Sequence, residues 1–370
     1  MSPLATARRL IVKIGSSLLV DEASGQVRRT WLDSLAADIA RCRARGQEVL
    51  VVSSGAVAVG RRKLGLTPPL KLEEKQAAAA CGQIRLAHAY QEALTHHSIT
   101  VAQVLLTLED SEDRRRYLNA RSTLETLLRL GAVPVINEND TVATAEIRVG
   151  DNDRLAARVA QMVSADALVL FSDIDGLYTA DPRKNPDARF IPEVREMTPE
   201  IEAMAGDPGS AYGSGGMVTK LVAARICLSA GCGMAITRGE VLHPLQAVEE
   251  GGRCTWFIPG SEPRTARKQW IFGSMKPTGA LILDDGAVRA LGKGRSLLPA
   301  GVTAVEGEFG RGDCVLVKDT AGRVLGRGLV AYSAADSRAI IGRQSGEIET
   351  ILGFRGRDEL IHRDDLVMEG

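Results

Sequence analysis

The sequence has no excess of either charge. Lys+Arg and Asp+Glu each number 46 among 370 residues, which gives a net charge of +0. Proteins whose main partner is nucleic acid usually carry a net positive charge or a large basic face. The balance therefore argues against nucleic-acid binding as the main role of the chain, although it leaves room for a local basic patch.

Cysteine is scarce and scattered. The six cysteines form no C-x-x-C pair and have no cluster of histidines near them in the sequence; they are Cys42, Cys81, Cys227, Cys232, Cys254 and Cys314. Zinc sites and disulfide frameworks need closely and regularly spaced ligands. The sequence predicts neither kind of site and favours a reducing compartment.

Long hydrophobic runs are also missing. The apolar stretch after Arg8 and Arg9 is broken at Lys13 and Gly15, so it is too short for the core of a signal peptide. No other run approaches the roughly 20 residues that cross a bilayer. We therefore expect a cytoplasmic protein with no membrane partner.

The length and composition indicate a protein of two domains. A chain of 370 residues is too long for one ordinary domain, and 45% hydrophobic with 25% charged residues is typical of a soluble protein with a sizeable core. Within residues 1–262, short apolar runs alternate with segments of helical period. The runs are 10–12, 49–52, 101–106, 133–136, 168–171 and 234–236.

These runs predict the fold class of the first domain. Apart from Gln103 they are continuously apolar, so the strands are expected to be buried on both faces, in a mostly parallel sheet with helices on each side. Ligands of such α/β sheets bind beyond the carboxyl ends of the strands. The polar segments expected at that edge are 13–17, 53–55, 137–141 and 172–175.

The pattern changes after residue 262. Residues 263–275 are basic and loop-like around Trp270-Ile271-Phe272, and they are predicted to form a linker. Residues 276–370 contain short β-type runs separated by glycine-rich turns at a spacing of about 10 residues. This predicts a small β-rich domain, a barrel with one or two short helices.

Residues 213–220, Gly-Ser-Gly-Gly-Met-Val-Thr-Lys, precede a helical run over 221–230. Glycines at a helix start let the backbone approach an anion, and the N–H groups and dipole of the helix attract phosphate. The spacing is not that of a P-loop, and the chain has no G-x-G-x-x-G fingerprint. A phosphate-binding turn is predicted here; a surface loop with one solvated lysine is the alternative.

Lys13 lies between apolar residues at the end of the first predicted strand. A buried ammonium group is costly unless it reaches a partner, and at a strand's carboxyl end it can lie over a ligand. Gly15 and Ser16 would offer N–H groups to the same phosphates. The alternative is a lysine that extends to solvent.

Acidic and amide residues gather in two segments, Asn137-Glu138-Asn139-Asp140 and Asp151-Asn152-Asp153. One of the latter three can cap the helix that begins near Arg154. The excess indicates recognition of a substrate ammonium group and orientation of lysines, with a Mg²⁺ site as the alternative use.

Several motifs together resemble the amino acid kinase family: Ser53-Ser54-Gly55-Ala56, Asp175-Gly176-Leu177-Tyr178 with Asp181-Pro182, and Gly215-Gly216-Met217 with Lys220. Residues 135–140 and 149–153 resemble its glutamate 5-kinase branch, and the tail after residue 276 resembles a PUA domain. The resemblance implies a three-layer αβα catalytic domain over 1–262, a linker over 263–275 and a PUA-like domain over 276–370.

The resemblance also implies an activity. The γ-phosphoryl group of ATP would pass to the γ-carboxylate of L-glutamate, giving γ-glutamyl phosphate, the first step of proline biosynthesis. It further implies Mg²⁺ as cofactor, feedback inhibition by proline and a homo-oligomer, either dimer or tetramer. A free carboxylate with a pKa of about 4.3 is already ionised, so no general base is needed. The obstacle is repulsion between anions, which Lys13 and Lys220 would neutralise while Asp153 orients them.

The remaining site residues follow from the motif matches. Those expected to bind ATP are Lys13, Gly15, Ser16, Ser172, Asp173, Ser214, Gly215, Gly216, Met217, Val218, Thr219 and Lys220. Those expected to bind glutamate are Ser54, Gly55, Asp140, Asp151 and Asn152. Asp140 or Asp151 would meet the α-amino group, and the others would bind the carboxylates. No metal ligand is assigned.

Other activities stay open at this point. Within the family the substrate can be acetylglutamate, aspartate, carbamate or UMP. An acetylated substrate has no ammonium group for the acidic and amide residues at 137–153, and UMP calls for an arginine-rich pocket that we do not find. RNA binding by the PUA-like tail is the alternative from another class, and the net charge of +0 makes it a secondary role.

Overall fold

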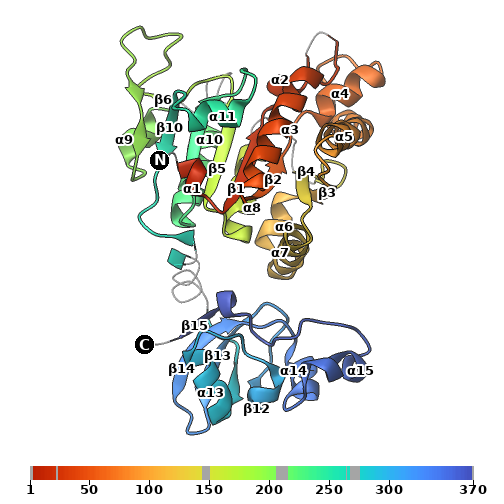
Figure 1. Cartoon of the computed structure of the whole chain (residues 1–370), viewed down its shortest axis with the longest axis vertical. Coiled ribbons are helices and arrows are strands. Elements are labelled where there is room, and N and C mark those ends of the chain that lie inside the picture. Colours follow the sequence, from red (N-terminus) through yellow and green to blue (C-terminus); the bar gives the residue numbers. More distant parts are fainter. Residues whose placement is uncertain are drawn as a thin grey trace. The chain divides into compact units, whose positions relative to one another are not determined.

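The computed structural model describes residues 3–21, 24–143, 151–205, 216–263, 265–266 and 276–368. The chain divides into two units, Met1–Pro263 and Arg264–Gly370, each with its own sheet (Figure 1). Most of the predicted linker at 263–275 lies outside the described residues. The predicted boundaries at 262 and 276 therefore stay a prediction.

An eight-stranded sheet forms the centre of the first unit. In chain order its strands are β1 (Arg9–Ile14), β2 (Glu48–Val52), β3 (Val101–Leu106), β4 (Val133–Glu138), β5 (Ala167–Ser172), β8 (Glu193–Val194), β9 (Gly233–Arg238) and β10 (Cys254–Phe257). Their order across the sheet is β3-β4-β2-β1-β5-β9-β10-β8, and only β9 and β10 pair antiparallel. All six strands expected from the apolar runs are present. The short strands β8 and β10, and the small hairpin of β6 (Leu177–Tyr178) with β7 (Phe190–Ile191), were not predicted.

Helices connect these strands. They are α1 (Pro3–Thr6), α2 (Ser16–Leu19), α3 (Arg29–Ala44), α4 (Ala56–Lys63), α5 (Leu72–Thr95), α6 (Leu108–Glu112), α7 (Arg114–Arg129), α8 (Asp151–Val163), α9 (Pro199–Ala203), α10 (Met217–Ser229) and α11 (Pro244–Glu249). Over the described ranges, none of the helices combines the length and apolar character needed to cross a bilayer.

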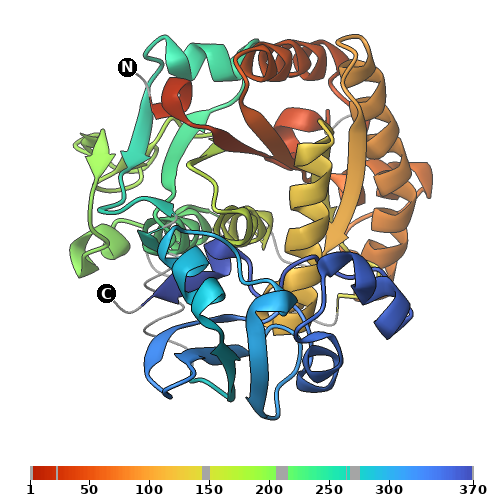
Figure 2. The ribbon, with the colours of Figure 1, turned by 60° about the horizontal axis from the view of Figure 1, so that its bottom comes forward.

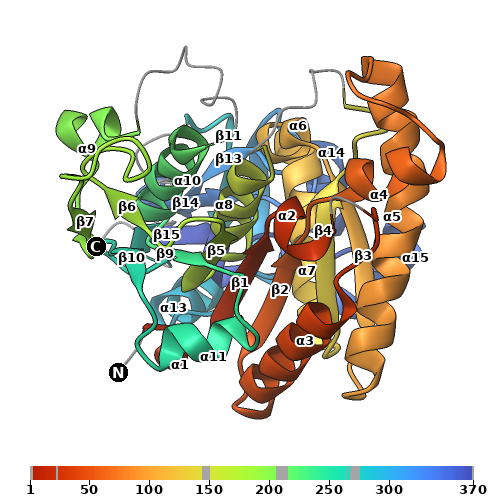
Figure 3. The same ribbon diagram turned by 90° about the horizontal axis from the view of Figure 1, so that it is seen from above.

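The helices cover both faces of the sheet (Figure 3). Successive side chains of a strand point to opposite faces. Leu10, Val12 and Ile14 of β1 accordingly pack in one core cluster with α3, α5 and α11, whereas Ile11 packs in the other with α7, α8 and α10. The predicted α/β class, a three-layer αβα arrangement around a mostly parallel sheet, is confirmed.

Helices α4 and α5 approach each other unusually closely. A Cβ atom at Gly60 would lie 1.7 Å from the carbonyl oxygen of Ala78, and a Cβ atom at Gly82 would lie 1.8 Å from that of Ala56. No larger side chain fits at either position without moving the backbones apart. The long helix α5, orange in Figure 2, is thereby fixed against α4 at one end of the sheet, beside the edge strand β3.

The second unit is built on a five-stranded sheet. Its strands are β11 (Gly279–Leu283), β12 (Val302–Gly307), β13 (Cys314–Asp319), β14 (Val324–Leu329) and β15 (Leu366–Met368), in the order β12-β11-β13-β14-β15. Helices α13 (Asp285–Gly292), α14 (Ala334–Ile340) and α15 (Ile348–Leu352) accompany it. The β-rich domain is confirmed. Within residues 276–368 no strand pairing joins β12 to β15, so the expected barrel is not closed by a ladder.

A fragment of residues 1–262 is expected to fold alone. Among the residues that the structure describes, the two core clusters of the first unit contain none beyond Phe257, and the core cluster of the second unit begins at Leu281. Urea denaturation of the fragment, followed by circular dichroism, should give one cooperative transition. A broad, non-cooperative transition, with the full chain cooperative under the same conditions, would show that the first unit depends on the second.

Candidate active site

Three predicted residues meet at the carboxyl edge of the sheet. The Nζ atom of Lys13 lies 2.5 Å from Oδ1 of Asp153, and the Nζ atom of Lys220 lies 3.1 Å from Oδ2 of the same carboxylate. Lys13 follows Ile11 by two positions on β1, so it points to the side of the sheet that α8 and α10 cover. Asp153 and Lys220 lie in the first turns of those two helices.

The three charged side chains of this cluster are buried, and burial affects the pKa of Lys13 and of Asp153. The exposed fractions are 7% for Lys13, 8% for Lys220 and 1% for Asp153. Burial lowers the pKa of the Lys13 ammonium below its ordinary value, and the attraction of Asp153 only partly offsets this. Burial alone would raise the pKa of Asp153, but the ammonium groups of Lys13 and Lys220 outweigh it and hold that pKa below its ordinary range. Two cations and one anion leave one net positive charge, so the cluster attracts an anion.

The start of α10 adds hydrogen-bond donors beside the cluster. Gly216 is the N-cap residue of this 13-residue helix, and Met217, Val218 and Thr219 begin its first turn. The first N–H groups of a helix have no partner within it, and they favour an anion. The hydroxyl of Thr219 lies 3.2 Å from Asp153 Oδ2 and 3.0 Å from the carbonyl oxygen of Gly216, which links the glycine turn to the cluster. Ser214 and Gly215 lie outside the described residues.

Two other predicted nucleotide-binding pairs lie at the ends of β1 and β5. Gly15 is the N-cap of α2, and Ser16 is its first residue, two and three positions after Lys13. Ser172 ends β5, and its hydroxyl lies 3.0 Å from Oδ1 of Asp173, whose side chain is 64% exposed. The charge of Asp173 acts on the pKa of Lys13, so this surface carboxylate is within electrostatic reach of the cluster.

The predicted substrate residues connect to the same turn of α8. The Nδ2 atom of Asn152 donates to the carbonyl oxygen of Ser53 at 2.8 Å and to Oγ of Ser54 at 2.9 Å. Gly55 has φ 98°, and a Cβ atom there would lie 2.9 Å from a methyl group of Val20, so the turn requires glycine. Asp140 is buried beyond the end of β4. The side chain of Asp151 lies outside the described residues.

The structure adds residues that were not predicted as part of the site. Gln83 of α5 contacts Asn137, and Tyr90 of α5 contacts Ser53. Asn137 and Ser53 in turn contact Asn152; we call Ser53, Ser54 and Asn152 the substrate segment. Asn137 belongs to a motif noted in the sequence, but its role as a support was not foreseen. Gln83 and Tyr90 lie inside a continuous helical pattern and carry no sequence signal of their own.

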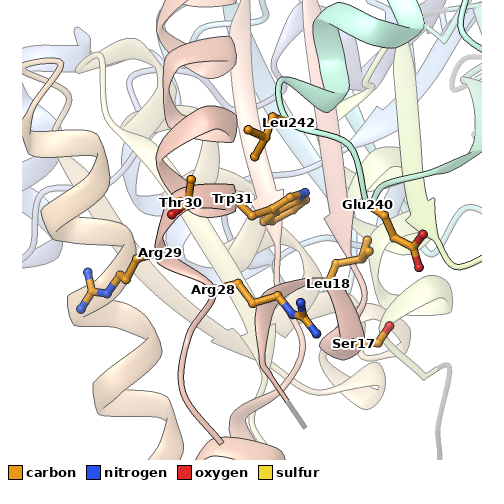
Figure 4. Close-up of a pocket in the computed structure, with 8 residues that line it drawn as sticks. All are labelled: Ser17, Leu18, Arg28, Arg29, Thr30, Trp31, Glu240 and Leu242. Atoms are coloured by element: carbon orange, nitrogen blue, oxygen red, sulfur yellow. The ribbon is translucent and has the colours of Figure 1, made fainter. Parts of the chain in front are cut away.

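A cavity of about 410 Å³ adjoins helix α2, and no predicted site residue lines it (Figure 4). Its lining is Ser17, Leu18, Arg28, Arg29, Thr30, Trp31, Glu240 and Leu242. Arg28 and Arg29 are paired with Asp21 and Glu92, and the indole N–H of Trp31 donates to the carbonyl oxygen of Gly239 at 2.7 Å. Because these groups already have partners, we assign no ligand to the cavity.

The described part of the chain contains no preformed cluster of metal ligands. Among those residues, no group of three or more His, Cys, Asp or Glu side chains is arranged to hold a metal ion. Both carboxylate oxygens of Asp153 are held by lysines. We therefore assign no protein ligand to Mg²⁺ among the described residues.

Comparison with known proteins decides the family. Residues 8–238 match the Amino acid kinase family, and residues 279–352 match the PUA domain. The chain belongs to the amino acid kinase family. The predicted resemblance, including its PUA-like tail, is confirmed.

Relatives that span the whole chain are named glutamate 5-kinase. The one from Paramagnetospirillum magneticum is 86% identical over 370 residues, which is 100% of both chains, and the one from Rhodospirillum rubrum is 64% identical over 97% of this chain and 96% of its own. A solved carbamate kinase from Giardia lamblia bound to AMP-PNP covers 69% of this chain and 99% of its own, at 16% identity and a TM-score of 0.50. This last likeness supports the fold alone.

Replacing Asp153 by Asn should destabilise the chain by about 3 to 5 kcal/mol near pH 7, because it leaves buried cations unpaired. The pKa of Asp153 is depressed in the folded chain, so its contribution is present above the unfolded pKa of about 3.9 and is lost as the pH falls through the lower folded value. The measurement is urea denaturation of both proteins between pH 3 and 7.

The difference in free energy of unfolding between wild type and Asp153→Asn should hold between pH 5 and 7 and shrink below about pH 4. The exposed Asp187 provides the control, since Asp187→Asn should change the free energy by less than about 0.5 kcal/mol. Equal stability of Asp153→Asn and wild type at pH 7 would contradict the electrostatic role of the carboxylate.

Proposed function

We propose that the chain transfers the γ-phosphoryl group of ATP to the γ-carboxylate of L-glutamate. A carboxylate oxygen would attack the γ-phosphorus, the bond from that phosphorus to the β,γ-bridging oxygen would break, and ADP would leave with the electron pair. The products are γ-glutamyl phosphate and ADP. The observation that carries the proposal is the buried cluster of Lys13, Asp153 and Lys220 with its net positive charge.

The chemistry calls for cations more than for a base. The attacking carboxylate is ionised at neutral pH, and two unit charges 4 Å apart repel by about 4 kcal/mol at an effective dielectric constant near 20. Lys13 and Lys220 would neutralise charge as it passes between the two anions. Asp153 has both oxygens engaged by those lysines, which suits a residue that positions cations and does not abstract a proton.

The nucleotide would lie over the glycine turns and the helix starts around the cluster. We assign its phosphates to Gly15, Ser16, Ser214 and the segment Gly215–Lys220, and another part of the nucleotide to Ser172 and Asp173. Mg²⁺, if carried by the nucleotide, would neutralise phosphate charge there. These assignments follow the motif matches and the position of the described residues at one edge of the sheet.

Glutamate would lie between the turn at Ser54-Gly55 and the first turn of α8. We assign its α-amino group to the buried Asp140 or to Asp151, and its carboxylates to Ser54, Gly55 and Asn152. Proline shares the α-amino and α-carboxylate groups, so we also propose that it competes with glutamate here. A homo-oligomer, dimer or tetramer, and a cytoplasmic location belong to the same proposal. RNA binding by the second unit is not part of the proposal, because the net charge of +0 does not favour it.

A substrate panel tests the proposed function. ADP release should be fast with glutamate and slower by a factor on the order of 10⁴ with N-acetylglutamate, because a site built for an ammonium group rejects a substrate that lacks it. Aspartate, carbamate and UMP complete the panel. Faster turnover of any of these four than of glutamate would replace the proposed substrate.

Lys220→Ala should lower turnover by about 10² to 10³ while the affinity for glutamate changes by less than about threefold. The reason is that a cation at the transferring phosphoryl group acts in the transition state and not on bound glutamate. The exposed Lys293 of the second unit gives the matched control, Lys293→Ala. A raised Michaelis constant with unchanged turnover would assign Lys220 to ground-state binding.

A further inference from the structure

Three side-chain amides form a hydrogen-bonded chain from helix α5 to the substrate segment. The Nδ2 atom of Asn137 donates to Oε1 of Gln83 at 2.7 Å. The Oδ1 atom of Asn137 accepts from Nδ2 of Asn152 at 3.1 Å. An amide can be turned end for end, so the direction of such a chain must be fixed by partners that only donate or only accept.

The backbone fixes Asn137 first. The N–H group of Glu138 donates to Oδ1 of Asn137 at 2.9 Å, and a backbone N–H can only donate. Oδ1 of Asn137 is therefore the acceptor end, and its Nδ2 must face Gln83. Gln83 in turn must present its Oε1 atom to Asn137.

The backbone fixes Asn152 in the same direction. Its Nδ2 atom lies 2.8 Å from the carbonyl oxygen of Ser53, which can only accept, and 3.1 Å from the acceptor end of Asn137. Oγ of Ser54, at 2.9 Å from the same nitrogen, is a third acceptor, so the two hydrogens of the amide nitrogen are already shared among protein acceptors. The polar atom of Asn152 that is left for a ligand is Oδ1, an acceptor. In place of the carboxylate contact expected from the sequence, an acceptor at this position suits an ammonium group.

Helix α5 fixes the position of Gln83, the first residue of the hydrogen-bonded chain of amides. Gln83 follows Gly82, whose close contact with α4 fixes the backbone at this point. Seven residues further along α5, the buried Tyr90 donates from its hydroxyl to Oγ of Ser53 at 3.0 Å. Residues at this spacing lie on one face of a helix. The same face of α5 thus supports the substrate segment at two points.

We infer that Gln83 is a positioning residue: by accepting from Nδ2 of Asn137 it holds that amide in the orientation set by the backbone, so that Asn152 stays placed with its oxygen toward the substrate and the pocket selects a substrate with a free α-ammonium group. The inference rests on the proposed function, because it concerns how glutamate is told from similar dicarboxylates. Gln83 acts through Asn137 and Asn152 and does not touch the substrate itself.

The test compares glutamate with glutarate, which is the same molecule without the α-amino group. Dissociation constants of both are measured by calorimetry for wild type, Gln83→Met and Gln83→Glu. Methionine keeps the length of the side chain and removes the acceptor, whereas glutamate at this position still accepts from Asn137. Steady-state kinetics with ATP and glutamate give turnover and both Michaelis constants.

Gln83→Met should weaken glutamate binding by about tenfold or more, the loss expected for a hydrogen bond to a charged group. Glutarate binding, the Michaelis constant for ATP and turnover should each change by less than about threefold, since none of them uses the α-ammonium group. Gln83→Glu should restore the wild-type preference for glutamate.

Gln76→Met is the matched control. Gln76 also lies on α5, seven residues before Gln83, and donates to the carbonyl oxygen of Ala143 at 3.2 Å, outside the amide chain. Its replacement should leave the ratio of glutamate to glutarate affinity unchanged.

Two results would overturn the inference. One is an unchanged ratio of glutamate to glutarate affinity in Gln83→Met. The other is an equal loss of affinity for glutamate and glutarate in both Gln83→Met and Gln83→Glu, which marks a purely structural role. A wild-type chain that binds glutamate without consuming ATP would overturn the proposed function instead. The affinity ratio would still decide the inference, because calorimetry needs no turnover.

Discussion

The carboxylate of Asp153 is the group on which the rest of the site depends. It is almost fully buried, and it forms ion pairs with two buried ammonium groups that come from a strand and from a second helix. Without it, β1 and α10 would bring like charges together in a region of low dielectric, where repulsion is strong. The three elements can meet at this edge of the sheet because their charges nearly cancel and leave one positive charge for an anion.

The sheet gives this cluster its geometry. Neighbouring parallel strands end at the same level, so residues far apart in the sequence arrive at one edge: Lys13 pairs in register with Leu170, and Ser172 pairs with Arg238. Helices that start after these strands direct their N–H groups to the same place. The fold thus supplies positive potential from backbone and side chains together, which is what transfer between two anions requires.

Much of this could be predicted from the sequence, because its signals are local. Continuous apolar runs marked the six longer strands, and Lys13 stood out as a charge at the end of one of them. Gln83 could not be found in this way, since a glutamine inside a regular helical pattern resembles any half-exposed position. The direction of Asn152 could not be predicted either, because it depends on Ser53 and Asn137, which only the folded chain brings within hydrogen-bond distance.

Asn152 and Asp153 are consecutive residues in the first turn of α8. One belongs to the proposed glutamate contact and the other holds the two lysines, so any shift of that turn moves both. The proposed roles of these two residues would therefore couple selectivity to catalytic rate. A redesign for a longer or shorter dicarboxylic amino acid would do best to leave α8 in place and to change the turn at Ser54-Gly55 on the other side of the proposed substrate position. A displacement of α8 to admit a new substrate would also misalign the two lysines.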